Sequence, residues 1–198
     1  PFLKRAVPAS IWSAHPCFIV HPGVPGDRGP SALDWAIQQG VPTWGVTVLQ
    51  AEAEMDAGPV WASAQFPMRA ARKAAIYRNE TTEAAVQAVL QAVDRFAAGN
   101  FTPERVPGTA HALMKQALAM LKAQVDVTPA PQWVRVVGGF SEHQFVEKRL
   151  PTLAELNAVA PDTPVFILHL YDRALLNAAA LRAVGYTKDT PEPPGGQI

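Results

Sequence analysis

Six ionisable side chains follow predicted strands of this chain and have the chemistry to act on a small substrate. They are His21, Asp27, Arg28, Glu52, Glu54 and Asp56. In open α/β sheets, ligand sites lie in the loops at the carboxyl ends of the strands. An imidazole beside a carboxylate can donate to an oxyanion and take a proton, as the transfer of a one-carbon acyl group requires. A single His after a strand also commonly has a structural role, so the spacing of His21 and Asp56 leaves both readings open.

Short apolar runs predict the strands that would position these side chains. The runs end at turn residues or polar loops, as buried strands do. The predicted strands are 17–20, 44–49, 60–66, 133–137 and 165–170, and the pair Gly138-Gly139 is expected to end the fourth.

Helices are expected between most of these strands. Ser31 and Asp34 resemble a capping box that opens a helix ending at Gly40. A second helix begins at Thr81 or Thr82, and its apolar residues Val86, Val89, Leu90 and Val93 recur at helical spacing. A further helix is predicted over 111–124, with Met114, Leu118, Leu121 and Val125 on one face. Two more are predicted, one from Thr152 with Glu155 as its capping partner and one over 173–184.

The composition excludes several classes of protein. Of 198 residues, 48% are hydrophobic and 17% charged, which allows a buried core. The formal net charge is zero, so we expect no nucleic-acid partner. The one cysteine excludes an internal disulfide and a cysteine-rich zinc site. No apolar run approaches the ~18 residues of a membrane span, so we expect no membrane association and a cytoplasmic setting.

Two stretches of the N-terminal half carry a family resemblance. They are "FIVHPGVPGDRGPSALDWAIQQG" from Phe18 and "WGVTVLQAEAEMDAG" from Trp44. Over residues 1–116 the chain resembles the folate-dependent formyltransferases, and within them the HypX (HoxX) type of hydrogenase-maturation factor. The shared features are a His-Pro pair after a strand, a glycine-rich loop leading into a helix, and a Met-Asp-Ala-Gly turn.

The resemblance implies a site and a cofactor. His21 is the implied catalytic group on the oxyanion side, and Asp56 is its carboxylate partner. The residues implied to line the pocket of 10-formyltetrahydrofolate are Glu52, Ala53, Glu54 and Met55. The wider family has Asn two residues before the His, where this chain has Ile19. Because Ile19 cannot donate to a formyl oxygen, a chain with no cofactor at all remains an alternative.

The C-terminal half resembles a different family. From about Ala117 the chain resembles the YtcJ-like branch of the metal-dependent amidohydrolases, whose fold is a TIM-type barrel. The motifs that carry this resemblance are "LPTLAELNAVAPDTPVF" and "ALLNAAAL". That family holds its metal with an early His-x-His pair, which is missing here, while His143 and His169 are isolated. We therefore expect no metal site, and about two βα units of a barrel, of which a closed barrel needs eight.

Together these observations predict an α/β fold with three layers (αβα) and one mainly parallel open sheet. A truncated formyltransferase-like, Rossmann-like part would occupy residues 1–116. A βαβα barrel fragment would occupy residues 117–198, either as a second part or merged with the first into one globular domain.

Three functions remain open at this point. The first is a chimeric protein whose N-terminal part derives from a formyltransferase of [NiFe]-hydrogenase maturation and lacks full activity. The second is residual formyl transfer or folate binding at His21 and Asp56. The third is a metal-dependent amidohydrolase. Incomplete sheets leave open edges and apolar faces, so we also expect a homo-oligomer formed through these edges. Asp27 and Arg28 are either part of the site or a surface pair.

Overall fold

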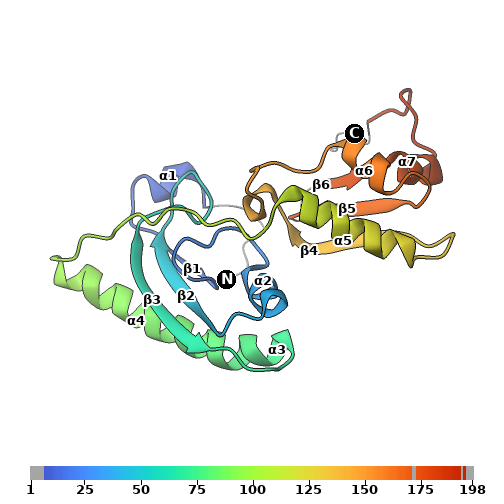
Figure 1. Cartoon of the computed structure of the whole chain (residues 1–198). Coiled ribbons are helices and arrows are strands. Elements are labelled where there is room, and N and C mark those ends of the chain that lie inside the picture. The colour runs from blue at the N-terminus through green and yellow to red at the C-terminus, as the bar shows by residue number, and fades with distance from the viewer. Residues whose placement is uncertain (1–6, 171–172, 193, 195–198) are drawn as a thin grey trace. The chain divides into compact units, whose positions relative to one another are not determined.

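The chain forms two compact units, residues 1–111 and 112–198. The computed structural model describes residues 7–170, 173–192 and 194, and Figure 1 labels their elements. The change from one family resemblance to the other between residues 116 and 117 is a separate prediction, which this division into units does not test. No helix among the described residues is long and apolar enough to cross a membrane.

The first unit contains a three-stranded sheet of order β1-β2-β3. Its strands are β1 (Phe18–His21), β2 (Thr43–Gln50) and β3 (Val60–Pro67), and both pairings are antiparallel. The prediction of a mainly parallel sheet is therefore wrong for this unit. Residues 51–59, which join β2 to β3, contain no helix, and a connection without a crossover makes neighbouring strands antiparallel.

Five helical elements belong to the first unit: α1 (Ala9–Trp12), α2 (Ala32–Gln39), α3 (Lys73–Ile76), the π-helical turn η1 (Tyr77–Thr81) and α4 (Thr82–Ala98). The expected capping box of α2 is absent. Ser31 has a positive φ of 68° and makes no side-chain cap bond, whereas a capping residue normally has an extended backbone conformation. Gly40 ends the helix in the left-handed conformation, as predicted.

Helix α4 packs against the sheet through a face other than the expected one. The residues that it buries are Ala84, Ala88 and Ala92. Val86, Leu90 and Val93 are 55%, 60% and 48% exposed. Small alanines allow the helix to approach the core around Trp44, Val46 and Phe66, and the larger apolar residues then face outward.

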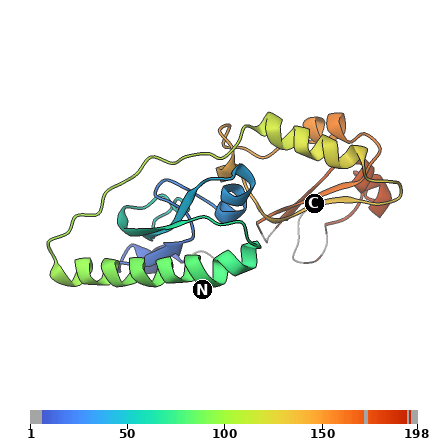
Figure 2. The same ribbon diagram turned by 60° about the horizontal axis from the view of Figure 1, so that its bottom comes forward.

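The second unit contains a mixed sheet with helices. Its strands β4 (Val134–Phe140), β5 (Val165–His169) and β6 (Arg173–Leu176) lie in the order β4-β5-β6. Its helical elements are α5 (Met114–Asp126), the 3-10 turn η2 (Glu142–Gln144), α6 (Leu153–Val159) and α7 (Ala178–Val184). Helices α5 and α6 lie together on one side of the sheet (Figure 2).

Several predictions for this unit are wrong in detail. Helix α5 begins at Met114, so His111 precedes it. Strand β4 continues through Gly138 and Gly139, which adopt positive φ angles within the strand. Residues 173–176 form strand β6, which pairs antiparallel with β5, and only then does α7 begin. β4 and β5 are parallel, but the antiparallel β6 departs from the all-parallel pattern of a barrel, and the barrel fragment is not confirmed.

Other local predictions hold. Thr152 caps α6: the backbone N–H of Glu155 donates to its hydroxyl at 3.2 Å, and the Glu155 carboxylate accepts from the Thr152 N–H at 2.8 Å. On α5, Met114, Leu121 and Val125 are buried. The capping box and the apolar spacing are local patterns, which explains why they could be read from the sequence.

Candidate functional site

The His-Pro-Gly turn after β1 is anchored to β2. His21 is the last residue of β1, lies opposite Thr47 and is buried. The Thr47 hydroxyl donates to the Gly23 carbonyl at 2.8 Å, and the Trp44 indole N–H donates to the Pro22 carbonyl at 3.2 Å. These two bonds hold the turn in place, so the position of the imidazole is determined by the sheet.

Carboxylates face both nitrogens of the His21 ring. Nε2 lies 2.5 Å from Oδ2 of Asp27, and Nδ1 lies 3.4 Å from Oδ2 of Asp56. Asp27 and His21 are both almost fully buried, while Asp56 is partly accessible. Residues from two loops thus meet at one imidazole, and the two residues predicted as catalytic lie within ion-pair distance of each other.

Asp56 is held by its own backbone and by the glycine-rich loop. It adopts a positive φ of 51°, an uncommon conformation for a residue with a side chain. The backbone N–H of Gly29 donates to its Oδ2 at 3.0 Å. This bond directs the carboxylate toward His21 and links the Met-Asp-Ala-Gly turn to the loop before α2.

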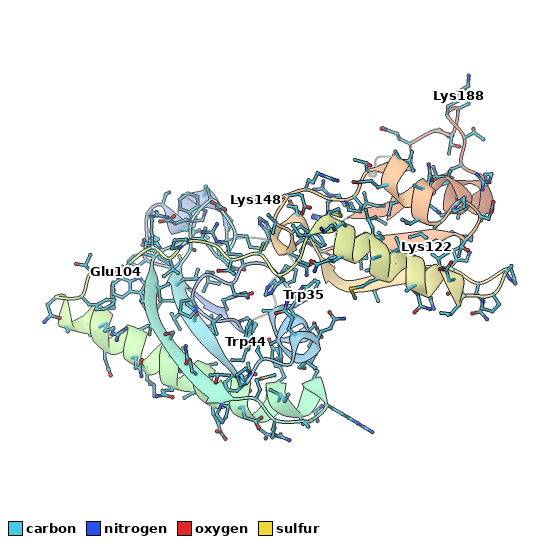
Figure 3. All side chains as sticks on the ribbon, viewed as in Figure 1. Trp35, Trp44, Glu104, Lys122, Lys148 and Lys188 are labelled. Carbon is cyan, nitrogen blue, oxygen red and sulfur yellow. The ribbon has the colours of Figure 1, made fainter. Side chains whose placement is uncertain are left out.

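Asp27 also forms an ion pair with a second histidine. Its Oδ1 faces Nε2 of His111, whose side chain is nearly buried. The His111 ring stacks on Trp35 of α2 with centroids 5.5 Å apart and planes inclined by 2°. Trp35 is labelled in Figure 3. One carboxylate therefore bridges two imidazoles.

The environment shifts the pKa values of this pair in opposite directions. Burial alone lowers the pKa of His21, but the hydrogen bond with Asp27 and the charges of Asp56 and Asp27 outweigh burial and raise this pKa above its ordinary value. Burial alone raises the pKa of Asp27, and its interactions with His111 and His21 outweigh burial and lower this pKa. Both shifts favour a charged pair, imidazolium with carboxylate.

The four residues predicted to line the cofactor pocket divide into two kinds. Glu52 accepts two bonds from Arg105 at 2.6 and 2.7 Å, and Glu54 accepts one from Arg28 at 2.6 Å. Ala53 and Met55 are exposed. The two carboxylates thus brace the loop, while Ala53 between them and Met55 after them are accessible.

An extended segment, residues 99–111, runs from the end of α4 back past the sheet (Figure 2). We call it the return segment. Glu104, labelled in Figure 3, accepts from the Val60 N–H at 2.8 Å. The Thr109 N–H donates to the Gly26 carbonyl at 2.8 Å. Through Arg105 and His111 this segment contributes two side chains to the surroundings of the site.

The sequence does not decide the place of two members of this arrangement. For Asp27 it allows either a site residue or a surface pair with Arg28, and the structure buries Asp27 against His21. His111 was expected to start a helix, whereas it contacts Asp27. Gly23 could have pointed to the first contact: a Cβ at this position would collide with Asp27 Oδ2 and His21 Nε2. A glycine two residues after the histidine is what such a close pair requires.

The second unit contains its own buried histidine. His169, at the end of β5, lies 2.8 Å from the Glu142 carboxylate through Nε2. This pair contributes to lowering the pKa of Glu142, although burial alone would raise it. Among the described residues, no group of three or more His, Cys, Asp or Glu side chains is arranged to hold a metal ion.

Comparison with known families divides the chain in the same order as its two units. Residues 7–93 match the formyl transferase family, and residues 105–198 match the amidohydrolase family. Neither match covers half of the chain. The chain is also 33% identical over 116 residues to an N-substituted formamide deformylase from Arthrobacter pascens, covering 57% of this chain and 21% of that protein.

The N-terminal match is stronger. The chain is 60% identical over 104 residues to the hydrogenase maturation factor HoxX from Bradyrhizobium diazoefficiens, covering 52% of this chain and 18% of that protein. It also resembles the crystal structure of HypX from Aquifex aeolicus in complex with tetrahydrofolic acid, with 55% identity and a TM-score of 0.53. This likeness covers 55% of the chain and 20% of HypX. The chain thus spans about a fifth of these relatives, and its N-terminal part resembles the formyltransferase part of HypX/HoxX proteins.

Proposed function

We propose that the first unit binds a reduced folate carrying a formyl group beside His21 and Asp56. The observation that carries this proposal is the meeting of the two side chains, with Nδ1 of His21 at 3.4 Å from Oδ2 of Asp56. An imidazolium donor next to a carboxylate acceptor suits a formyl oxygen and the proton of an attacking amine or thiol.

The donor and acceptor groups of the loop are compatible with 10-formyltetrahydrofolate. A reduced pterin ring presents amino and ring N–H donors, which need acceptors. Glu52 and Glu54 are engaged with Arg105 and Arg28, so the exposed backbone around Ala53 would offer peptide acceptors, with the neighbouring Met55 as an apolar contact. When bound, this cofactor supplies an activated formyl group. The solved HypX complex with tetrahydrofolic acid supports a folate ligand for this type of segment.

The proposed activity is binding with little turnover. Ile19 offers no hydrogen-bond donor where the wider family has Asn, and both ring nitrogens of His21 already face carboxylates. A single missing oxyanion donor typically costs about 10²–10³ in rate. We therefore expect formyl transfer by this chain to be slow compared with a full formyltransferase.

We further propose that the chain arose by joining two unrelated segments. The formyl transferase match ends at residue 93 and the amidohydrolase match begins at residue 105, so the two families account for successive parts of the chain. On this proposal the second unit contributes no residue to the folate site.

Isothermal titration with a stable deaza analogue of formylfolate tests the binding proposal. The wild-type chain should release heat with a saturable isotherm, and His21→Ala and Asp56→Asn should each weaken binding at least about tenfold, or about 1.4 kcal/mol. His143→Ala is the matched control, because this residue belongs to the second unit. Binding that is absent in the wild type, or unchanged in both site variants, would falsify the proposal.

A further inference from the structure

The two edges of the His21 ring differ in how firmly they are held. Nε2 makes a short hydrogen bond to Asp27 at 2.5 Å, whereas Nδ1 is 3.4 Å from Asp56. Charge-assisted N–H···O bonds usually measure about 2.7–2.9 Å, so the contact with Asp27 is at least as close as such a bond, whereas 3.4 Å is long for one. The ring is thus anchored at Nε2, while Nδ1 is the edge that can accept a different partner.

Asp27 is itself anchored from several directions. Its backbone N–H donates to the Val24 carbonyl at 2.9 Å, and its backbone forms an isolated β-bridge with Thr109 of the return segment. Its second carboxylate oxygen faces His111, which is stacked on Trp35. A carboxylate with this many fixed neighbours can hold an imidazole in one orientation.

We propose that Asp27 is the positioning residue of the site, which holds His21 through Nε2 so that Nδ1 faces Asp56 and the substrate, and that His111 of the return segment secures Asp27. This inference rests on the proposed folate site, because only a bound formyl group would require a particular orientation of Nδ1. His21, Asp27 and Asp56 lie within the formyl transferase match, whereas His111 lies beyond its end at residue 93 and inside the range of the amidohydrolase match. His111 belongs to the first unit, so the proposed arrangement is formed by that unit alone.

The charged groups around His21 make this assignment testable. Asp27 and Asp56 face the ring directly, and His111 faces Asp27. Arg28, next in the chain, directs its guanidinium to Glu54. Removal of the Asp27 charge should therefore change the hydrogen bond at Nε2 of His21 and the pKa of the ring, and leave the contact of Nδ1 with Asp56 in place.

Nitrogen-15 NMR of histidine-labelled full-length chain measures this directly, with His21→Gln used to assign the signal. In the wild type, the Nε2 proton of His21 should resonate far downfield, and the ring should titrate above its ordinary pKa of 6.5. Asp27→Asn should remove the downfield proton and lower the midpoint by about one unit or more. Asp34→Asn is the matched control, because that carboxylate pairs with Lys73 on the surface of the same unit.

His111→Gln tests the second layer of the arrangement. Here the downfield proton should remain, because Asp27 is still present, but it should exchange faster with water. Analogue binding should weaken about tenfold in Asp27→Asn and stay unchanged in Asp34→Asn, provided that the wild type binds.

Each outcome bears on the proposal. A downfield Nε2 proton that survives in folded Asp27→Asn, or a His21 midpoint equal in the two Asp variants, overturns the assignment of Asp27. If Asp27→Asn does not fold, the wild-type titration decides: a midpoint at or below 6.5 contradicts a charged, anchored ring. Since the NMR readout needs no folate, a wild type that fails to bind the analogue refutes the proposed function without touching this test.

Discussion

His21 ends β1, Asp27 lies in the loop that follows it, and Asp56 lies in the loop between β2 and β3. The two carboxylates meet at one buried imidazole. A buried charge needs a partner, and breaking such a pair from one side is strongly destabilising. His21 has a carboxylate at each nitrogen, and Asp27 has an imidazole at each oxygen. This cluster is the feature on which both the proposed site and part of the unit's stability depend.

The stability of the first unit should depend on pH through this pair. The pKa of Asp27 is lowered from 3.8, so its contribution is present above that value and is lost as the pH falls through the lower folded pKa. The pKa of His21 is raised from 6.5, so its contribution is complete below that value and is lost as the pH rises through the higher folded pKa.

The difference in unfolding free energy between wild type and Asp27→Asn should therefore be largest between these two ordinary values, at about 3 kcal/mol. Urea denaturation at pH values below, within and above this window measures it. A difference that is the same at every pH would show that the charge of the pair does not stabilise the unit.

At the scale of elements, Asn177 joins three parts of the second unit. It is fully buried between β6 and α7. Its Oδ1 accepts from the N–H groups of Val165 and Ala180 at 2.9 Å each, and its Nδ2 donates to the carbonyls of Ala160 and Thr163 at 2.7 and 3.0 Å. One side chain thus caps α7 and ties it to β5 and to the end of α6.

Asn177→Ala should destabilise the second unit by about 3 kcal/mol, because three buried backbone groups and one partly buried carbonyl lose their partner at once. Chemical denaturation followed by circular dichroism gives the value. Asn79→Ala is the control: this amide is exposed and donates only to the Ala75 carbonyl, so its loss should cost about 0.5 kcal/mol. Equal costs for the two variants would argue against the central role of Asn177.

At the scale of the whole molecule, α4 presents an apolar face to its surroundings. This face consists of Val86, Leu90, Val93 and Phe96. Beside it, Val20 of β1 and Val86 line a cavity of about 170 Å³ whose other walls include Val46 and Ala85. β1 pairs with β2 alone in the described sheet, so one of its edges is open. Open edges and apolar patches of this kind favour association.

We therefore expect the chain to self-associate through this face, as its sequence already suggested. Light scattering during gel filtration should give a mass above that of one chain, 21.3 kDa. Leu90→Lys should shift the mass toward the monomer, since it places a charge in the middle of the face. Val127→Lys, at an exposed position of the second unit, should have no effect. A wild-type chain that runs as a monomer contradicts the expectation.

Local patterns determined much of what could be read from the sequence alone. The capping box of Thr152 and Glu155, the left-handed Gly40 and the apolar spacing of α5 involve neighbours within a few residues, and the structure agrees with each. The resemblance of residues 18–62 to formyltransferases likewise depends on contiguous sequence motifs, and the family match over residues 7–93 supports it.

Only the tertiary structure decided which distant residues meet. The pairing of Asp27 with His21 depends on a turn anchored by Thr47, and Gly23 is its one local sign in the sequence. The pairing of His111 with Asp27 depends on a return segment that crosses the unit, and no local pattern reports it. The same holds for the antiparallel sheet of the first unit and the outward face of α4, because strand direction and helix orientation are set by the packing of the whole unit. The sequence alone therefore determined the types of the reactive side chains and the family motifs around them, whereas long-range packing decided which side chains contact one another.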